Sequence, residues 1–460
     1  MSIYHTNLNF FTQNFDISGN NKAIYGEVHT DFKLINEMLQ LIPNEFFKNP
    51  DLTWLDPCTG RGYFSMVLYK KLFFHLSKVI INPEERHNHI ITKMIYMVEI
   101  NNEFIPTLKK MFGEKSNIFN KNFLDFKINK KFNFIIGNPP FNVGGLIKVP
   151  TKQGIKTKDG RTIWQSFIKK SMDLLTYKGF LLFITPSIWM KSDHPLYQHM
   201  LSYKIYKIKT LTNTETNKIF HKQAQTPTCF FLLQSIVHKN LDYSTKIYDK
   251  IYKKYFKFNV KHQQIISLPL CMPSIIQKLY NIRLQYDNIK VIKTSMRPGY
   301  KNLKISYIAN EEHPYPNIST CKLNKLQPQL IINYSNIKCS HYKQPKLVLA
   351  HKMYGFPFYD KEGKFGISNR DNFVILHKND KDFIKLKQFL STKFIISLFE
   401  ATRYRMKYLE RYIFDILPDV TLIDEFPEDI NEESVLNFFN INEVERNFIN
   451  LCLKKNYLTF

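Results

Sequence analysis

An asparagine, two prolines and an aromatic residue follow a largely apolar segment in the first third of the chain. The segment 132–136 leads through Gly137 into Asn138, Pro139, Pro140 and Phe141. A run of this kind, bounded by Gly and Pro, predicts a buried strand that ends at Asn138. Each proline lacks an N–H and fixes φ, so the loop after the strand is expected to be stiff.

The chemistry that this loop offers is activation of an amine. The side-chain oxygen of Asn138 and the carbonyl of Pro139 can each accept one hydrogen of a nucleobase amine, while the ring stacks on Phe141. An aryl amine is a poor nucleophile because its lone pair is delocalised, and two acceptors favour the pyramidal form that attacks. We therefore predict a catalytic set of Asn138, Pro139, Pro140 and Phe141. For the tetrapeptide alone, an ordinary proline turn is the alternative.

Length and charge limit the class of protein. The chain has 460 residues, which predicts two or three domains. It carries 65 Lys and Arg against 39 Asp and Glu, a formal charge of +26. This excess favours a polyanionic partner such as nucleic acid over a merely charged surface.

The cysteines and the absence of long apolar runs indicate the compartment. Six cysteines are scattered without paired C-x-x-C spacing, which supports neither a zinc site nor a disulfide framework. No signal peptide or membrane-spanning run is evident in the sequence. We therefore expect no metal and no membrane partner, and an intracellular location in the cytoplasm, the nucleoid or a viral factory.

A strand, a glycine turn and a helix are predicted between residues 53 and 72. The apolar residues 53–55 run into Asp56-Pro57-Cys58-Thr59-Gly60-Arg61-Gly62. This is the first unit of a Rossmann-like sheet, in which glycines let a ligand approach the backbone closely. The third glycine of the dinucleotide fingerprint is missing, and this disfavours NAD.

Three further positions complete the pattern. Thr30 is predicted to cap an amphipathic helix over 32–42. A strand at 94–98 ends in Glu99, where an acidic side chain can hold a ribose diol, although a solvated strand end is the simpler alternative. The short unit 122–126 then precedes the strand that ends at Asn138.

The order of these motifs, preceded by Gly26-Glu27-Val28, resembles the gamma class of S-adenosylmethionine-dependent adenine amino-methyltransferases. This class includes restriction-modification methylases and their relatives in phages and large DNA viruses. The resemblance implies catalysis at 138–141 and S-adenosylmethionine as cofactor. It also implies cofactor contacts at Thr30, Asp56, Pro57, Cys58, Gly60, Gly62, Glu99, Asn122 and Phe123.

The resemblance continues to about residue 236, and it has departures. A helix at 164–175, a strand at 178–189 and a closing hairpin at 225–233 are similar to later parts of the methylase sheet. Asn122 stands where an Asp is usual, and Arg61 stands where a small residue is usual. These departures make a weakened enzyme an alternative.

The second half of the chain varies between members of the class, and it contains candidates for DNA contact. Residues 345–350 are predicted to form a strand, and 355–368 a hairpin that turns at 361–363. Together with the basic loop 142–161, the chain offers as DNA-binding candidates Lys148, Lys156, Arg297, Lys352 and Arg370. A surface charge is the alternative for each of them.

The sequence therefore predicts an α/β protein: a Rossmann-like class I methyltransferase sheet followed by a mixed α+β target-recognition domain. The predicted limits are an arm at 1–21, a methyltransferase domain at 22–236, a recognition domain at 237–420 and an acidic segment at 421–460. The predicted reaction is methylation of adenine N6 in double-stranded DNA, with a cognate restriction endonuclease or a partner subunit as further partners. The alternatives are methylation of RNA or of protein glutamine, and a catalytically weakened nucleic-acid-binding platform.

Overall fold

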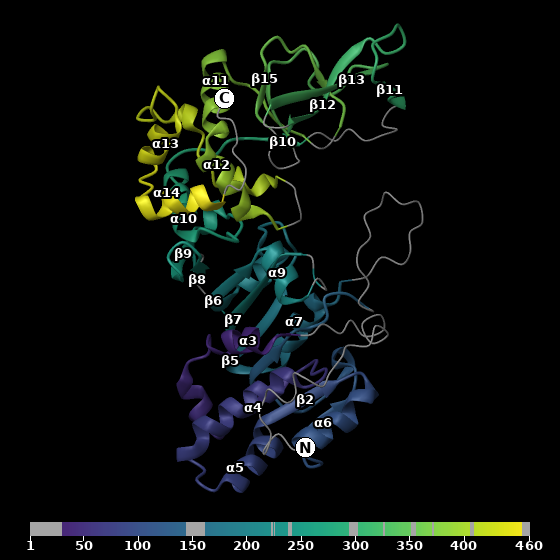
Figure 1. The fold of residues 1–460 in the computed structure, drawn as a ribbon, viewed down its shortest axis with the longest axis vertical. Coiled ribbons are helices and arrows are strands. Elements are labelled where there is room, and N and C mark those ends of the chain that lie inside the picture. The colour runs from purple at the N-terminus through teal and green to yellow at the C-terminus, as the bar shows by residue number, and fades with distance from the viewer. Residues whose placement is uncertain are drawn as a thin grey trace. The chain divides into compact units, whose positions relative to one another are not determined.

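The computed structural model describes most of the chain as helices and strands (Figure 1). The described residues are 30–143, 162–221, 224, 226–237, 242–293, 302–324, 327–350, 356–369, 372–404 and 409–452. They form two compact units. The first unit runs to Trp189 and includes 193–247, and the second comprises 190–192 and the chain from Tyr248 onward.

A twisted sheet forms the centre of the first unit. Its strands are β1 (Trp54–Asp56), β2 (Ile95–Glu99), β3 (Asn117–Asn120), β4 (Phe132–Gly137), β5 (Leu175–Pro186), β6 (Tyr203–Leu211) and β7 (Thr228–Val237). They lie in the order β3-β2-β1-β4-β5-β7-β6, and β8 (Tyr243–Asp249) pairs next to β6. The pairs from β3 to β5 are parallel, whereas β7 runs antiparallel to β5 and β6. The predicted Rossmann-like sheet and its closing hairpin are thus confirmed.

Helices pack against this sheet because its strands are apolar on both faces (Figure 1). The α-helices are α3 (Phe32–Leu39), α4 (Tyr63–His75), α5 (Pro83–His89), α6 (Ile105–Phe112), α7 (Trp164–Leu174), α8 (Tyr197–Leu201) and α9 (Asn213–Ile219). Single turns follow several strands, among them η4 (Asn102–Phe104), η5 (Phe123–Asp125) and η7 (Ser187–Met190). Each connection returns the chain so that the next parallel strand begins at the same edge.

One sequence-based detail of α3 is wrong. The N-cap is Asp31, whose side chain accepts the N–H of Lys33 at 2.6 Å, and it is not Thr30. Both residue types suit an N-cap, so local sequence does not separate them. Thr30 precedes this N-cap and is buried, with 5% of its surface exposed.

An aromatic stack fixes the central strands below the carboxyl edge of the sheet. Trp54 on β1 stacks on Phe134 of β4, with ring centroids 4.0 Å apart, and Phe134 stacks on Phe180 of β5 at 5.2 Å. All three rings are buried. Offset aromatic contacts of this kind each contribute about 0.5–1.5 kcal/mol beyond the area they bury. The stack therefore holds the ends of β1 and β4 in a fixed relation.

The second unit contains two small sheets. One is formed by β10 (Ile292–Lys293), β17 (Asn372–Ile375), β14 (Lys346–Ala350) and β15 (Phe358–Asp360), and the other by β11 (Ile305–Ser306), β13 (Gln327–Ser335), β12 (Tyr315–Asn324) and β16 (Gly366–Ile367). The strand predicted at 345–350 is confirmed as β14. The hairpin predicted over 355–368 is wrong, because β15 pairs with β14 whereas β16 pairs with β12. The turn exists, but it passes the chain from one sheet to the other.

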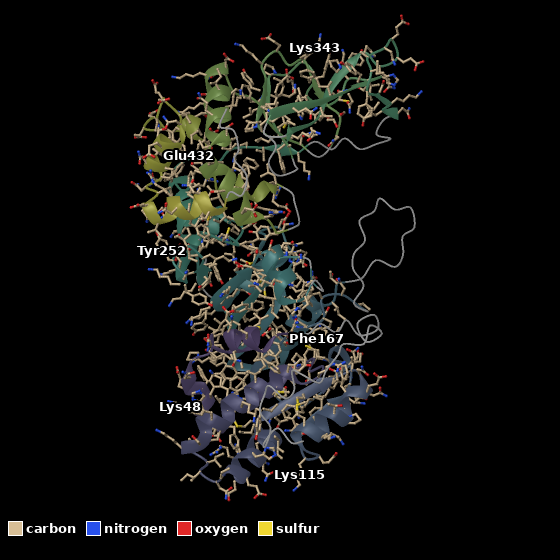
Figure 2. All side chains as sticks on the ribbon, viewed as in Figure 1. Lys48, Lys115, Phe167, Tyr252, Lys343 and Glu432 are labelled. Carbon is tan, nitrogen blue, oxygen red and sulfur yellow. The ribbon has the colours of Figure 1, made fainter. Side chains whose placement is uncertain are left out.

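The helices of the second unit include the acidic end of the chain. They are α10 (Pro273–Arg283), α11 (Asp380–Ser391), α12 (Lys393–Leu398), α13 (Glu432–Phe438) and α14 (Glu443–Cys452), with β9 (Lys254–Val260) beside β8. Glu432, labelled in Figure 2, accepts the N–H groups of Lys393 and Phe394 and so caps α12. Phe439 packs against Phe394. Residues 421–452 are therefore part of a packed unit.

Candidate active site

The carboxamide of Asn138 is held from one end only. Its Nδ2 donates to Thr30 Oγ1 at 3.0 Å, across 108 residues of sequence. Its Oδ1 is buried and has no hydrogen-bond partner among the described residues. A buried acceptor without a donor costs about 1–3 kcal/mol. The site thus keeps an unmet demand for a hydrogen-bond donor directly after β4.

The loop after β1 lies against the loop after β4, because the two strands are parallel neighbours. A Cβ atom on Gly137 would lie 3.3 Å from Asp56 Oδ1 and 3.6 Å from Cys58 Sγ. The backbone N–H of Asn138 hydrogen-bonds to the Cys58 sulfur. Glycine at 137 therefore permits a close approach of the two loops, and Cys58 fixes the backbone of Asn138.

Asp56, the last residue of β1, is a buried carboxyl without a cationic partner. It is 2% exposed. It accepts Ser65 Oγ at 3.0 Å and, more weakly, the N–H of Cys58 at 3.4 Å. Among the described residues, no Lys, Arg or His forms an ion pair with it. Burial raises the pKa of Asp56 to about 7, and the nearby charge of Glu99 raises it further, while the two hydrogen bonds oppose the rise.

Glu99 joins the end of β2 to the glycine turn. One carboxylate oxygen accepts the N–H of Gly60 at 2.6 Å, and the other accepts the N–H of Asn101 at 2.8 Å. Glu99 is 6% exposed. A carboxylate oxygen can accept more than one hydrogen bond. The predicted ribose contact at Glu99 remains a prediction.

The backbone conformation of the turn after β1 requires glycine at two positions. Gly60 and Gly62 have φ of 54° and 88°, a region that residues with a Cβ rarely adopt. A Cβ on Gly62 would also lie 2.8 Å from Leu108 Cδ2. The guanidinium of Arg61 lies over the ring of Phe104, 5.1 Å from its centroid. The unusual Arg61 thus has a packing partner on η4.

The side chains of Asn122 and Phe123 already have contacts within the first unit. Asn122 caps η5: its Oδ1 accepts the N–H of Leu124 at 3.1 Å, and its Nδ2 donates to Asp125 Oδ2 at 2.6 Å. Phe123 is buried against Phe167 of α7, which is labelled in Figure 2, with ring centroids 5.2 Å apart. The cofactor contacts expected of Asn122 and Phe123 remain predictions.

The remaining residues of the predicted catalytic set follow Asn138 directly. Pro139 is buried, whereas Pro140 and Phe141 are half-buried. The carbonyl of Phe141 accepts the N–H of Ile163 at 3.1 Å, and Asn142 forms a β-bridge with Thr162. The chain on the two sides of 144–161 is thereby joined at the catalytic loop.

All five DNA-binding candidates lie outside the described residues: Lys148, Lys156, Arg297, Lys352 and Arg370. The motif residues 26–28 lie outside them as well. No group of three or more His, Cys, Asp or Glu in the described ranges is placed to hold a metal ion. Within the same ranges, no helix is both long and apolar enough to cross a bilayer.

Sequence reasoning missed two contacts in this site. The first is the bond between Thr30 and Asn138, for which no local signal exists. The second is Ser65, fully buried in the first turn of α4 and bonded to Asp56. A single hydroxyl in the apolar stretch 64–68 was a signal for it, because a buried hydroxyl needs a partner.

The sheet order and the loops at the carboxyl ends of β1, β2 and β4 define a Rossmann-like class I methyltransferase domain. Residues 61–220 match the family of Eco57I restriction-modification methylases. This part of the chain is thus similar to methylases of the restriction-modification type.

Individual proteins similar to the chain have related descriptions. An uncharacterized adenine-specific methylase of Mycoplasma pneumoniae (strain ATCC 29342 / M129 / Subtype 1) is 25% identical, over 50% of this chain and 71% of its own length.

Among solved structures, the type IIL restriction-modification enzyme MmeI in complex with DNA has a TM-score of 0.49 at 12% identity, over 87% of this chain and 69% of that one. A modification subunit of a putative type I restriction enzyme from Vibrio vulnificus YJ016 has a TM-score of 0.37 at 13% identity, over 50% of this chain and 49% of that one. The chain thus spans about half the length of this type I subunit.

Proposed function

We propose that the protein transfers a methyl group from S-adenosylmethionine to the N6 amine of adenine at specific sites in DNA. The observation that carries this proposal is the buried Oδ1 of Asn138, which has no partner among the residues that the structure describes, in an intact Asn-Pro-Pro-Phe loop. The restriction-modification methylase match and the adenine-specific description of the Mycoplasma relative support it.

The residues around the glycine turn fit S-adenosylmethionine. This cofactor carries positive charge on its sulfonium and its ammonium, and the site offers two buried carboxyl groups, Asp56 and Glu99. Gly60 and Gly62 keep the turn open to close approach. We expect the same loop, with Pro57, Cys58, Asn122 and Phe123, to hold the cofactor. When bound, the cofactor supplies a methyl group that is already activated by the sulfonium.

The catalytic residues act on the target amine. Asn138 Oδ1 and the Pro139 carbonyl accept its two hydrogens, which localises the lone pair on nitrogen. Phe141, half-buried beside them, provides a face on which the base stacks. The adenine must leave the duplex to reach these groups. The amine nitrogen then bonds to the methyl carbon, the S–C bond breaks with its electron pair left on sulfur, and one N6 proton passes to solvent.

DNA as the substrate is supported by the charge of +26. On this proposal the region from 237 to 420 recognises the target sequence, and a cognate restriction endonuclease or a partner subunit completes the system. Lys148, Lys156, Arg297, Lys352 and Arg370 remain the candidates for contact with the phosphate backbone. An RNA methyltransferase keeps the same catalytic chemistry and is the nearest alternative.

The test is transfer of tritium from labelled S-adenosylmethionine to duplex DNA, single-stranded DNA and RNA. We expect label in the adenine of duplex DNA, reduced by at least about a hundredfold in Asn138→Ala, because the variant lacks one preorganised acceptor. Asn36→Ala, which removes an exposed amide on α3, is the matched control and keeps full activity.

Two other outcomes would change the conclusion. Label in RNA alone would transfer the function to the RNA substrate. No label on any nucleic acid, together with no binding of the cofactor by calorimetry, would leave a nucleic-acid-binding platform with a methylase fold.

A further inference from the structure

We propose that Thr30 is a positioning residue, which holds the Asn138 carboxamide so that its oxygen faces the target amine. This role differs from the contact with the cofactor that the sequence resemblance implies for Thr30, and it rests on the proposed function. The geometry behind it is the 3.0 Å bond from Asn138 Nδ2 to Thr30 Oγ1, together with the Oδ1 at the other end of the same amide, which no described residue hydrogen-bonds.

A carboxamide has a donor end and an acceptor end, and only one orientation serves this reaction. If the amide turned over, its NH₂ would face the amine and set donors against donors. The bond to Thr30 gives Nδ2 an acceptor in the productive orientation and holds the side-chain torsion. A reversed amide could still bond to the hydroxyl, which also donates, but it would lose the complementary contact with the amine. The prolines after Asn138 fix the backbone, but they do not act on the torsion of its side chain.

Thr30 is itself fixed by packing of α3. The residue is 5% exposed and directly precedes the N-cap Asp31. The start of α3 meets the start of α4, where the Phe32 and Tyr63 rings contact edge to face with centroids 5.3 Å apart. One face of α3 is buried in the core: Leu34, Ile35, Met38 and Leu39. The Thr30 hydroxyl is therefore placed by one element and the Asn138 backbone by another.

The two anchors of Asn138 come from different sides. Its backbone N–H bonds to Cys58 in the loop after β1, and its side-chain Nδ2 bonds to Thr30 before α3. Removing the side-chain anchor leaves the backbone in place and frees the torsion of the amide. A misplaced catalytic group of this kind lowers turnover much more than binding.

The test compares Thr30→Val, which keeps the shape and removes the acceptor, with Thr30→Ser, which keeps the hydroxyl. We expect Thr30→Val to lower kcat about tenfold to a hundredfold, with the Kd for S-adenosylmethionine changed by less than about threefold. Thr30→Ser restores most of kcat. Thr92→Val, which loses a hydroxyl bonded to the Asn88 carbonyl before β2, is the control for loss of a threonine hydroxyl and keeps kcat.

Three results would overturn the proposal. An unchanged kcat in Thr30→Val would show that the bond does not matter. A higher Kd for S-adenosylmethionine, with kcat unchanged at saturating cofactor, would show that Thr30 is a cofactor contact instead. Equal losses of kcat in the Val and Ser variants, with equally lowered Tm, would indicate a structural role.

A second measurement separates this proposal from the proposed function. In protein labelled with ¹⁵N-asparagine, the Asn138 side-chain NH₂ signal is assigned by its loss in Asn138→Ala. We expect Thr30→Val to shift this signal and to speed its exchange with solvent, whether or not any nucleic acid accepts a methyl group. An unmoved signal would contradict the hydrogen bond itself, whereas a wild-type protein that labels no substrate would contradict only the function.

Discussion

Two buried aspartates, one in each unit, have opposite surroundings. Asp360 ends β15 and is 4% exposed. It pairs with the fully buried Lys346 at 2.6 Å and accepts the N–H groups of Lys364 and Phe365, both at 2.9 Å. Burial lowers the pKa of Lys346, and the bond to Asp360 opposes that fall. The charge of Asp360 is therefore compensated within the fold.

Asp56 ends β1 and is equally buried, but its partners are the Ser65 hydroxyl and the Cys58 N–H. None of the described Lys, Arg or His residues forms an ion pair with Asp56, and burial raises its pKa to about 7. The comparison teaches that the second unit uses its buried carboxylate for structure. For the first unit, we propose that a cationic cofactor neutralises Asp56 at the carboxyl edge of the sheet.

The largest effect on stability is expected when the buried Lys346–Asp360 pair is broken. Lys346→Met leaves Asp360 buried without its cation, and we expect the free energy of unfolding to fall by about 3–5 kcal/mol. Chemical denaturation of the full chain measures it. Lys361→Met, which removes the solvent-exposed partner of Asp380, is the control and causes a much smaller change. Equal losses in the two variants would show that burial of the Lys346–Asp360 pair is unimportant.

Removing the Asp56 carboxyl is expected to raise the free energy of unfolding, which is the opposite of the effect of Lys346→Met. The folded protein binds the extra proton on Asp56 between about pH 4 and about pH 7, so this group stabilises the fold less as the pH rises through that range. At about pH 8 we expect Asp56→Asn to be more stable than the wild type by about 1–3 kcal/mol, and the difference to vanish at low pH. Asp51→Asn, at an exposed residue before β1, is the control. A gain that does not depend on pH would contradict the raised pKa.

The same residue connects stability to ligand binding. If Asp56 faces a cation in the complex, the affinity for S-adenosylmethionine rises between about pH 6 and about pH 8, and binding releases part of a proton. Calorimetry in two buffers with different ionisation enthalpies measures that release. We expect Asp56→Asn to weaken binding about tenfold or more and to abolish the pH dependence. Affinity independent of pH in the wild type would separate Asp56 from the cofactor.

The smallest effect tests the neighbour of Asp56. Glu99→Gln removes a charge that helps to raise the pKa of Asp56. When Asp56→Asn is introduced into this variant, the pH range over which it increases the free energy of unfolding therefore moves to lower pH. We expect a shift of less than about one pH unit, because burial is the larger cause. A shift to higher pH would show that loss of the bonds from Glu99 to Gly60 and Asn101 has rearranged the loop instead.

The sequence alone determined the order of the sheet elements and the loops that bear the site. Apolar runs, the Asp56–Gly62 turn and the Asn138–Phe141 loop are local patterns, and they predicted the ends of β1 and β4 to within one residue. Residue types also identified the acceptor chemistry of Asn138. Local patterns suffice here because parallel strands end at one edge, so residues at those ends converge without further information.

Only the tertiary structure decided which groups meet. The bond between Thr30 and Asn138 joins residues 108 positions apart, and it depends on how α3 packs. β15 and β16 belong to different sheets because β15 pairs with β14 and β16 pairs with β12. The turn residues between them do not specify these partners. The difference between Asp56 and Asp360 arises because one lies beside a lysine and the other beside a serine. A carboxylate's charge depends on what surrounds it in space, and that is set by packing.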